Sequence, residues 1–266
     1  MDVNTAADYA FARDGGAAAR RHALLAEAYD PVTLDRLAET GVGSGWQCLE
    51  VGAGAGTVSV WLAERVAPSG EVLATDVRRP VLPRMPGLRG QVHDAVTDPL
   101  PEAAFDLVVA RLVLRHLPQR AQVLDGLVRA LKPGGWLQID EFDTSYEPPL
   151  LVDDAADRRV FESFLAAKDI AMRARGVDPS FGRHAAGAMR DAGLVEVDPR
   201  PRVQLRHPGS ADLALLAENV TDMRDSLREA GMSEHELDRV RDLFAAPGFR
   251  ACSSLLYSVH GRKAAR

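Results

Sequence analysis

The segment Leu49–Thr57, with the sequence LEVGAGAGT, constrains the fold of this chain more than any other feature. An apolar stretch containing the acidic Glu50 leads into a turn with glycine at every second position, and a helix is expected from Thr57. Glycine has no Cβ and tolerates positive φ, so the backbone of such a turn can approach a ligand closely. The first N–H groups of the following helix point at the same place. The segment therefore predicts a site for a small, nucleoside-bearing ligand.

Strand and helix patterns alternate through the first half of the chain. Strands are expected at 46–51, 71–75, 88–92, 105–110 and 136–142, helices at 17–29, 31–40, 57–66 and 118–131, and a tight turn at 132–135. Two more strands are expected at 194–197 and 249–260. Repeated strand–helix–strand order is typical of a parallel sheet covered on both faces. We therefore predict an α/β fold: a doubly wound, Rossmann-like, mostly parallel seven-stranded sheet.

The alternation stops after Asp143, and this break sets the predicted domain boundaries. Residues 1–45 are expected to form an N-terminal helical segment, and residues 46–143 and 182–266 the core of the fold. Segments 144–181 and 210–246 are predicted to be helical insertions, the first being too long for a simple connection. Because the chain leaves the carboxyl end of a central strand there, where such sheets bind ligands, we predict that the insertions form a cap over the site.

Composition narrows the class of protein. The net charge of −6 gives no support for nucleic-acid binding, and no apolar stretch approaches the roughly 20 residues that span a bilayer. The N-terminus lacks the pattern of a signal peptide. The two cysteines, Cys48 and Cys252, have no metal-ligand spacing and are predicted to be buried thiols. These features predict a cytoplasmic protein with no metal, membrane or nucleic-acid partner.

A nicotinamide dinucleotide fold is the main alternative, and the glycine turn disfavours it. That fingerprint is G-x-G-x-x-G, and its third glycine allows close helix–strand packing. Here Thr57 stands in place of the third glycine. A carboxylate at Glu50 would also repel a pyrophosphate, whereas it suits a cationic or zwitterionic ligand.

Four motifs occur in order along the chain: Glu50–Gly56, Asp76 at the end of the second strand, Asp94-Ala95 after the third, and Leu131–Gly135 before the fifth. With these motifs the chain resembles the class I S-adenosylmethionine-dependent methyltransferases, particularly the small-molecule enzymes of actinobacterial natural-product pathways. The resemblance implies S-adenosylmethionine as cofactor and S-adenosylhomocysteine as product. The cofactor-binding residues that it implies are Glu50, Gly52, Ala53, Gly54, Gly56, Asp76, Val77, Asp94, Ala95, Arg111 and His116.

Three residues are candidates to bind, position or deprotonate the methyl acceptor. His116, just after the fourth strand, titrates in a useful range and is either a base or a lining residue of the cofactor pocket. Glu141 leaves the fifth strand and either positions a substrate or is a surface or cap-binding carboxylate. Tyr146 begins the predicted cap, and either contacts an aromatic substrate or packs in the cap core.

The N-terminal segment often folds over the cofactor in related enzymes. Tyr9 and Phe11 are therefore candidates to lie there, and Arg20 or Arg21 is a candidate to meet the methionyl carboxylate. For both arginines, exposure on the surface is the alternative.

The resulting prediction is a methyltransferase that moves a methyl group to an O, N or C atom of a small molecule, in the subclass EC 2.1.1.-. The acceptor is expected to be a secondary metabolite. The alternative is a protein that keeps the fold and binds the cofactor without transferring methyl, as a cyclase or a regulator. The sequence leaves the oligomeric state open, with a homodimer as one option.

Overall fold

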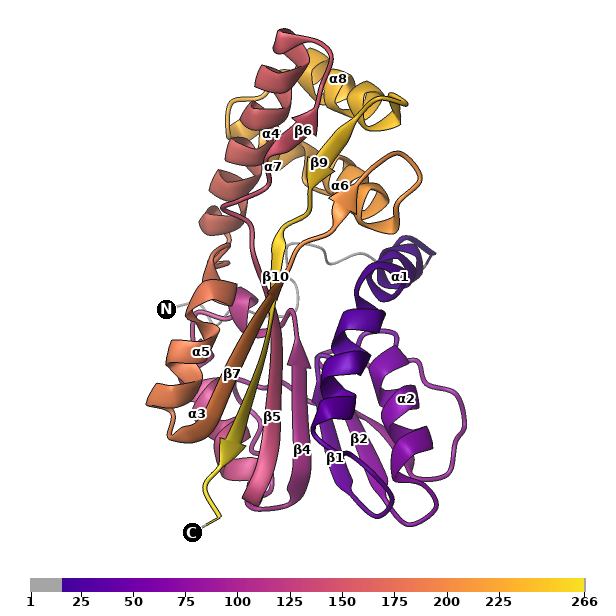
Figure 1. Cartoon of the computed structure of the whole chain (residues 1–266), viewed down its shortest axis with the longest axis vertical. Coiled ribbons are helices and arrows are strands. Elements are labelled where there is room, and N and C mark those ends of the chain that lie inside the picture. Colours follow the sequence, from indigo (N-terminus) through magenta and orange to yellow (C-terminus); the bar gives the residue numbers. More distant parts are fainter. Residues whose placement is uncertain (1–15, 266) are drawn as a thin grey trace. The chain divides into compact units, whose positions relative to one another are not determined.

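The computed structural model describes residues 16–265, which form two compact units (Figure 1). The sheet unit contains Tyr29–Phe142, Phe181–Pro201 and the chain from Leu256 onward. The helical unit contains the chain up to Ala28, Asp143–Ser180 and Arg202–Leu255. The chain therefore crosses between the units several times, and each unit is assembled from separated segments.

The sheet unit is built on seven strands. They are β1 (Gln47–Val51), β2 (Glu71–Asp76), β3 (Leu88–Val92), β4 (Phe105–Arg111), β5 (Leu131–Asp143), β7 (Leu194–Arg202) and β10 (Leu255–Lys263), in the order β3-β2-β1-β4-β5-β10-β7. Strands β3, β2, β1, β4 and β5 pair in parallel, and β10 runs in the opposite direction (Figure 1). The predicted α/β fold with a mostly parallel seven-stranded sheet is confirmed.

Helices cover both faces of the sheet, as a doubly wound fold requires. On one face, Leu37 from α1 (Gly16–Glu39) and Leu62 from α2 (Thr57–Val66) pack against β1, β2 and β4. On the other face, α3 (Arg120–Ala130) and α5 (Phe181–Asp191) pack against β1, β4 and β5. Most side chains of β1 and β4 are buried, which explains their nearly continuous apolar sequence.

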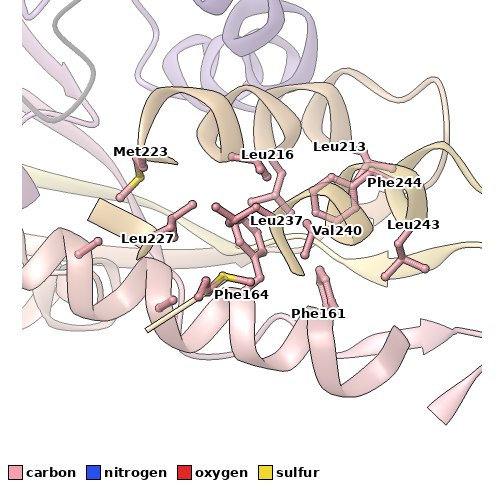
Figure 2. Packing of buried hydrophobic residues seen from close by; sticks show 14 of the residues in the cluster. Phe161, Phe164, Leu213, Leu216, Met223, Leu227, Leu237, Val240, Leu243 and Phe244 are labelled. Atoms are coloured by element: carbon pink, nitrogen blue, oxygen red, sulfur yellow. The ribbon is translucent and has the colours of Figure 1, made fainter. Parts of the chain in front are cut away.

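The helical unit has its own core and a second, three-stranded sheet. Its helices are α4 (Ala155–Ala174), α6 (Ala211–Asp222), α7 (Arg224–Glu229) and α8 (Glu234–Ala245). They surround a cluster in which Phe161 contacts Phe244 and Phe249 edge-on, with ring centroids 6.1 and 5.4 Å apart (Figure 2). The sheet has the order β6 (Pro149–Leu151), β9 (Arg250–Cys252), β8 (Leu205–Arg206). Strands β6 and β8 were not predicted, and β9 lies within the single strand predicted at 249–260.

Several predicted element boundaries are wrong. Pro31 does not start a second helix, because α1 continues through it and buries Thr33 and Leu37 against the sheet. The segment 132–135 is not a turn before a strand but an irregularity within β5, where the register with β4 shifts. The strand expected at 249–260 is broken after Cys252, since β9 and β10 belong to different sheets.

The expected core segment 182–266 also differs from the observed units. Residues 202–209 and 247–255 belong to the helical unit, where β8 pairs with β9. Whether the helical unit caps the site stays a prediction.

Candidate functional site

The strand order changes direction between β1 and β4, and the glycine turn lies at this switch point. In open α/β sheets, ligands bind outside the carboxyl ends of the strands at such a point. Gly52, Gly54 and Gly56 have φ of 72°, 53° and 73°, in the left-handed region that favours glycine. A Cβ on Gly52 would overlap the side chain of Val113, and one on Gly56 would overlap Leu82. Glycine is therefore needed at both positions for packing as well as for backbone conformation.

Asp76 closes the glycine turn from the end of β2. Its carboxylate accepts the N–H groups of Gly54 at 3.0 Å and Arg78 at 3.2 Å, and the Ala53 N–H donates to the Thr75 carbonyl at 2.9 Å. The Asp76 side chain remains half-buried, and the neighbouring Val77 is 45% exposed. The predicted cofactor residues Gly52 to Gly56, Asp76 and Val77 are thus contiguous in space.

Asp94 follows β3 at the same edge of the sheet. Its side chain accepts the Val96 N–H at 2.9 Å, and both Asp94 and Ala95 are half-buried. Like Asp76, it is an accessible carboxylate fixed by a backbone turn. Two such carboxylates on neighbouring strands can accept hydrogen bonds from the hydroxyl or amino groups of a nucleoside.

Glu50 is buried behind the glycine turn. Its carboxylate accepts a hydrogen bond from the Ser59 hydroxyl on α2. Burial raises the pKa of Glu50 to about 7, and Ser59 and the more distant Arg111 only partly oppose this. Glu50 is therefore a buried acid that lacks a cation in direct contact among the described residues, and a cationic ligand nearby would stabilise its charged form.

Arg111 ends β4, and its guanidinium is held by the N-terminal helix. Arg111 Nη1 lies 2.6 Å from the Asp30 carboxylate. The next residue, Leu112, has a φ of 56°, which is rare for a side chain of this kind and marks a strained backbone. The Arg111 backbone lies at the switch point, while its side chain forms an ion pair with Asp30.

His116 and Glu141 meet at the turn after β4. His116 lies half-buried in the short helix η2 (Leu114–His116). Glu141, on β5, is fully buried, and its Oε1 accepts the N–H groups of Val113 at 3.0 Å and Arg115 at 3.2 Å. Burial raises the pKa of Glu141 to about 7, against the opposing effects of Arg115 and these N–H groups. The predicted role of Glu141 at the acceptor stays a prediction.

Other candidates lie apart from this cluster. Tyr146 belongs to the helical unit, where it is 57% exposed, and its role stays a prediction. Tyr9 and Phe11 lie outside the described residues. Arg20 is exposed and pairs with Glu218 at 2.8 Å, and the half-buried Arg21 donates to Asn219 at 2.8 Å.

His93 follows β3 directly before Asp94, and its sequence position alone did not single it out. The side chain is 4% exposed, and neither ring nitrogen has a hydrogen-bond partner among residues 16–265. No pattern in the sequence distinguishes a buried histidine that has hydrogen-bond partners from one that lacks them.

The described part of the chain offers neither a metal-binding cluster nor a membrane-spanning helix. Among residues 16–265, no cluster of His, Cys, Asp and Glu has the composition to hold a metal ion. No helix in this range is both long enough and apolar enough to cross a membrane.

The parallel strand order and the glycine turn at the switch point, with Asp76 at the end of β2 and Asp94 after β3, fit the Rossmann-like methyltransferase fold. A family model described as a methyltransferase domain matches residues 49–137, about a third of the chain. This range contains the glycine turn, Asp76, Asp94, Arg111 and His116. The chain is therefore similar to methyltransferases over this range.

Curated relatives are methyltransferases of moderate similarity. Methyltransferase str3 of Strobilurus tenacellus is 28% identical over 172 residues, covering 64% of this chain and 60% of the relative. The ubiquinone/menaquinone biosynthesis C-methyltransferase UbiE of Laribacter hongkongensis is 32% identical over 120 residues, covering 42% and 49%. The chain therefore spans about half to three fifths of the length of these relatives.

A solved structure shares the fold. Phosphoethanolamine N-methyltransferase 2 of Haemonchus contortus, in complex with S-adenosyl-L-methionine, aligns with a TM-score of 0.54 and 13% identity, covering 93% of this chain and 56% of the other. The cofactor in that complex is the one predicted from the sequence resemblance.

Proposed function

We propose that this chain is an S-adenosylmethionine-dependent methyltransferase, of the subclass EC 2.1.1.-, that acts on a small molecule. The observation that carries the proposal is the arrangement of the glycine turn at the switch point beside two accessible carboxylates, Asp76 and Asp94. The methyltransferase family match over residues 49–137 supports it.

The residues at the sheet edge fit this cofactor. Asp76 and Asp94 supply acceptors for the ribose hydroxyls and the adenine amino group, in the order that the family resemblance implies. The buried acid Glu50, without a cation in direct contact, suits a ligand with a sulfonium and an ammonium group. Gly52, Ala53, Gly54 and Gly56 give the close backbone approach, while Val77, Ala95, Arg111 and His116 complete the proposed cofactor-binding set.

Methyl transfer from a sulfonium depends more on the alignment of donor and acceptor than on the stabilisation of a developing charge. When bound, S-adenosylmethionine supplies an electrophilic methyl group on a positively charged sulfur. The protein must hold an acceptor lone pair in line with that group, and positioning of this kind contributes up to about 7–11 kcal/mol. His116 is proposed to take the proton of an oxygen or nitrogen acceptor, since a histidine at this edge can act as a general base.

The finer part of the proposal concerns the acceptor. We propose a secondary metabolite, selected by the segments 144–181 and 210–246, in which Tyr146 offers a ring for an aromatic substrate. One of the proteins compared above is named a C-methyltransferase and another an N-methyltransferase, so the proposal does not specify the acceptor atom.

The first experiment measures cofactor binding by calorimetry. The wild type is expected to bind S-adenosylmethionine and S-adenosylhomocysteine, and Asp76→Ala is expected to weaken binding at least tenfold, the size of about 1.4 kcal/mol. Glu71→Ala is the matched control, because Glu71 is an exposed acid at the opposite end of the same strand. Absence of binding to the wild type would refute the proposal.

The second experiment measures transfer. The protein is incubated with methyl-labelled cofactor and a panel of phenols, indoles, amines and sugars, and the demethylated product is followed. Turnover on one acceptor class supports a methyltransferase, and His116→Ala should then lower kcat by a larger factor than it raises the cofactor Kd. Tight cofactor binding without turnover on any acceptor would favour the non-methylating alternative. An unchanged kcat in the variant would remove His116 as the base.

A further inference from the structure

Two consecutive residues of β5 accept three backbone N–H groups of the turn that follows β4. The Asp140 carbonyl accepts the Leu112 N–H at 2.8 Å, and Glu141 Oε1 accepts the N–H groups of Val113 and Arg115. The first of these bonds uses backbone alone, so it places no demand on the side chain at 140. The other two depend on a carboxylate at 141.

This turn needs such support because it is strained. Leu112 adopts a left-handed φ of 56°, and a non-glycine residue in that region persists only where its surroundings impose it. Buried backbone N–H groups also require partners. Glu141 meets both needs with a single oxygen, and it does so from a fully buried position.

The turn after β4 also packs against the glycine turn that follows β1. The Val113 side chain fills the space that a Cβ on Gly52 would occupy, so Val113 packs directly on the first glycine of the cofactor-binding segment. His116 is part of the same short helix, and its N–H donates to the Val113 carbonyl at 3.0 Å. A single carboxylate on β5 therefore connects to the Gly52 turn and to His116 through Val113.

We propose that Glu141 is a positioning residue, which holds the Leu112–His116 turn against the glycine turn and so keeps the cofactor edge assembled. This inference rests on the proposed function, since it takes that edge to be the cofactor site. It is an alternative to the predicted role of Glu141 at the acceptor.

The surroundings of Glu141 make this role sensitive to protonation. Arg115 on η2 is the charged side chain that favours the carboxylate, whereas Arg120 on α3 donates to the Leu114 carbonyl and stacks over Phe181 of α5. Glu141 Oε2 is buried and has no hydrogen-bond partner among the described residues. The Val113 and Arg115 N–H groups lower the pKa of the buried carboxylate, so a local opening of the turn that leaves Glu141 buried would raise that pKa. For such an opening, the turn should be held more firmly above the pKa of Glu141 than below it.

The test compares three proteins. Glu141→Gln keeps an acceptor oxygen but cannot ionise. Glu141→Met keeps a side chain of similar size but has neither an acceptor oxygen nor an ionisable group. Asp140→Asn is the matched control, because Asp140 is a buried acid on the same strand whose side chain contacts Thr33 and Gln138 instead of the turn. Hydrogen exchange of the Val113 and Arg115 amides and the Kd for S-adenosylhomocysteine are measured, and tryptophan fluorescence verifies the fold.

In Glu141→Met, the two amides should exchange at least tenfold faster and the Kd should rise about tenfold, as expected for the loss of a charged hydrogen-bond acceptor. Glu141→Gln and Asp140→Asn should stay within about threefold of the wild type at neutral pH. Between about pH 6 and pH 8, amide protection corrected for intrinsic exchange should increase in the wild type and stay flat in Glu141→Gln.

Unchanged amide exchange in Glu141→Met would overturn the proposal. If that variant does not fold, the pH dependence decides instead, and an equal pH dependence in the wild type and Glu141→Gln would overturn it. Failure of the wild type to bind cofactor would refute the proposed function but would leave the exchange result to judge Glu141 separately.

Discussion

Buried glutamates in the two units have opposite electrostatic settings. In the helical unit, Glu147 lies 2.8 Å from Lys168 Nζ and 3.2 Å from Arg206 Nη1, with all three side chains buried. Burial raises the pKa of Glu147, but the two cations more than reverse this effect and lower it to about 2. In the sheet unit, Glu50 and Glu141 have pKa values raised to about 7, because among residues 16–265 no cation in direct contact offsets their burial.

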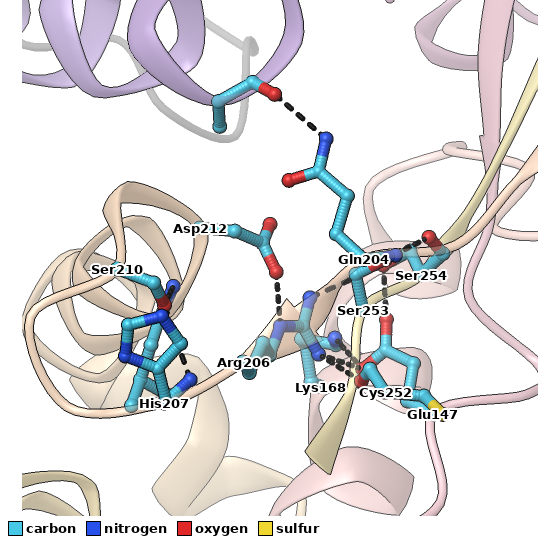
Figure 3. A network of polar contacts seen from close by, with 12 residues as sticks. Glu147, Lys168, Gln204, Arg206, His207, Ser210, Asp212, Cys252, Ser253 and Ser254 are labelled. Atoms are coloured by element: carbon cyan, nitrogen blue, oxygen red, sulfur yellow. Dashed lines mark hydrogen bonds and ion pairs between the residues drawn. The ribbon is translucent and has the colours of Figure 1, made fainter. Parts of the chain in front are cut away.

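In the network around Glu147, buried cations compensate the charges of buried carboxylates (Figure 3). Arg206 also binds Asp212, with Nε 2.5 Å from the carboxylate, and the Ser254 hydroxyl donates to Glu147. Two cations thus face two anions drawn from the connector after β5, α4, β8 and α6. The sheet unit instead leaves acids undercompensated at its carboxyl edge. Perturbed groups of this kind gather where a protein binds or reacts, so the difference separates a structural cluster from a site.

The largest expected effect comes from removing one cation of the Glu147 network. Arg206→Met would leave Glu147 and Asp212 short of their shared partner in a buried setting. Breaking a buried pair from one side costs about 3–5 kcal/mol, so the free energy of unfolding should fall by that amount. Urea unfolding followed by far-UV circular dichroism measures it.

Arg239→Met is the control for this prediction. Arg239 pairs with Asp157 at 2.5 Å, but its side chain is 38% exposed, and solvent screens the pair. A much smaller loss is expected. Equal losses in the two variants would show that the buried network is no more important for stability than a surface pair.

A smaller effect is expected from Glu50, and it should depend on pH. The pKa of Glu50 is about 7 in the folded chain and 4.5 as an ordinary side chain, so the folded state binds the proton more tightly. This contribution to stability is fully present below about pH 4.5 and is lost as the pH rises through about 7. Relative to the wild type, Glu50→Gln should therefore gain up to about 3 kcal/mol between about pH 5 and pH 8.

The fluorescence of Trp46, Trp61 and Trp136 reports this change, because all three tryptophans lie in the sheet unit. Glu147→Gln provides the contrast. The stability that Glu147 contributes is present above about pH 4.5 and is lost only as the pH falls through about 2, so its difference from the wild type should be constant over the same interval. A slope in Glu147→Gln, or none in Glu50→Gln, would contradict the comparison.

The two units also differ in how far their structure could be predicted. Helix α2 and strand β3 have the predicted bounds, because glycine punctuation and apolar periodicity are local signals. In the helical unit, β6, β8 and β9 are two or three residues long and exist through pairing with distant segments. No local pattern of that length distinguishes a strand from a loop. For the same reason, no local signal indicates that the strand predicted at 249–260 is divided after Cys252 between two sheets.

The site was predictable only in part for a related reason. The glycine turn, Asp76 and Asp94 follow strands directly, so their shared edge follows from the parallel topology. Glu141 was placed on the correct strand, but its contact with the turn after β4 depends on a backbone conformation set by Leu112. Likewise, Lys168 and Arg206 are 38 positions apart in sequence, and their shared contact with Glu147 gives no local signal.

The smallest and most direct comparison removes one hydroxyl donor from a buried carboxylate in each unit. Thr33 donates to Asp140 at 2.6 Å in the sheet unit, and Ser254 donates to Glu147 in the helical unit. Thr33→Val should cost about 1.5–3 kcal/mol, since the pKa of Asp140 is already raised by burial and the acid loses a donor. Ser254→Ala should cost about 0.5–1.5 kcal/mol, because Glu147 keeps both cations. Urea unfolding of the two variants under one set of conditions measures the difference, and a larger loss for Ser254→Ala would mean that compensation by cations does not protect a buried carboxylate from the loss of a neutral donor.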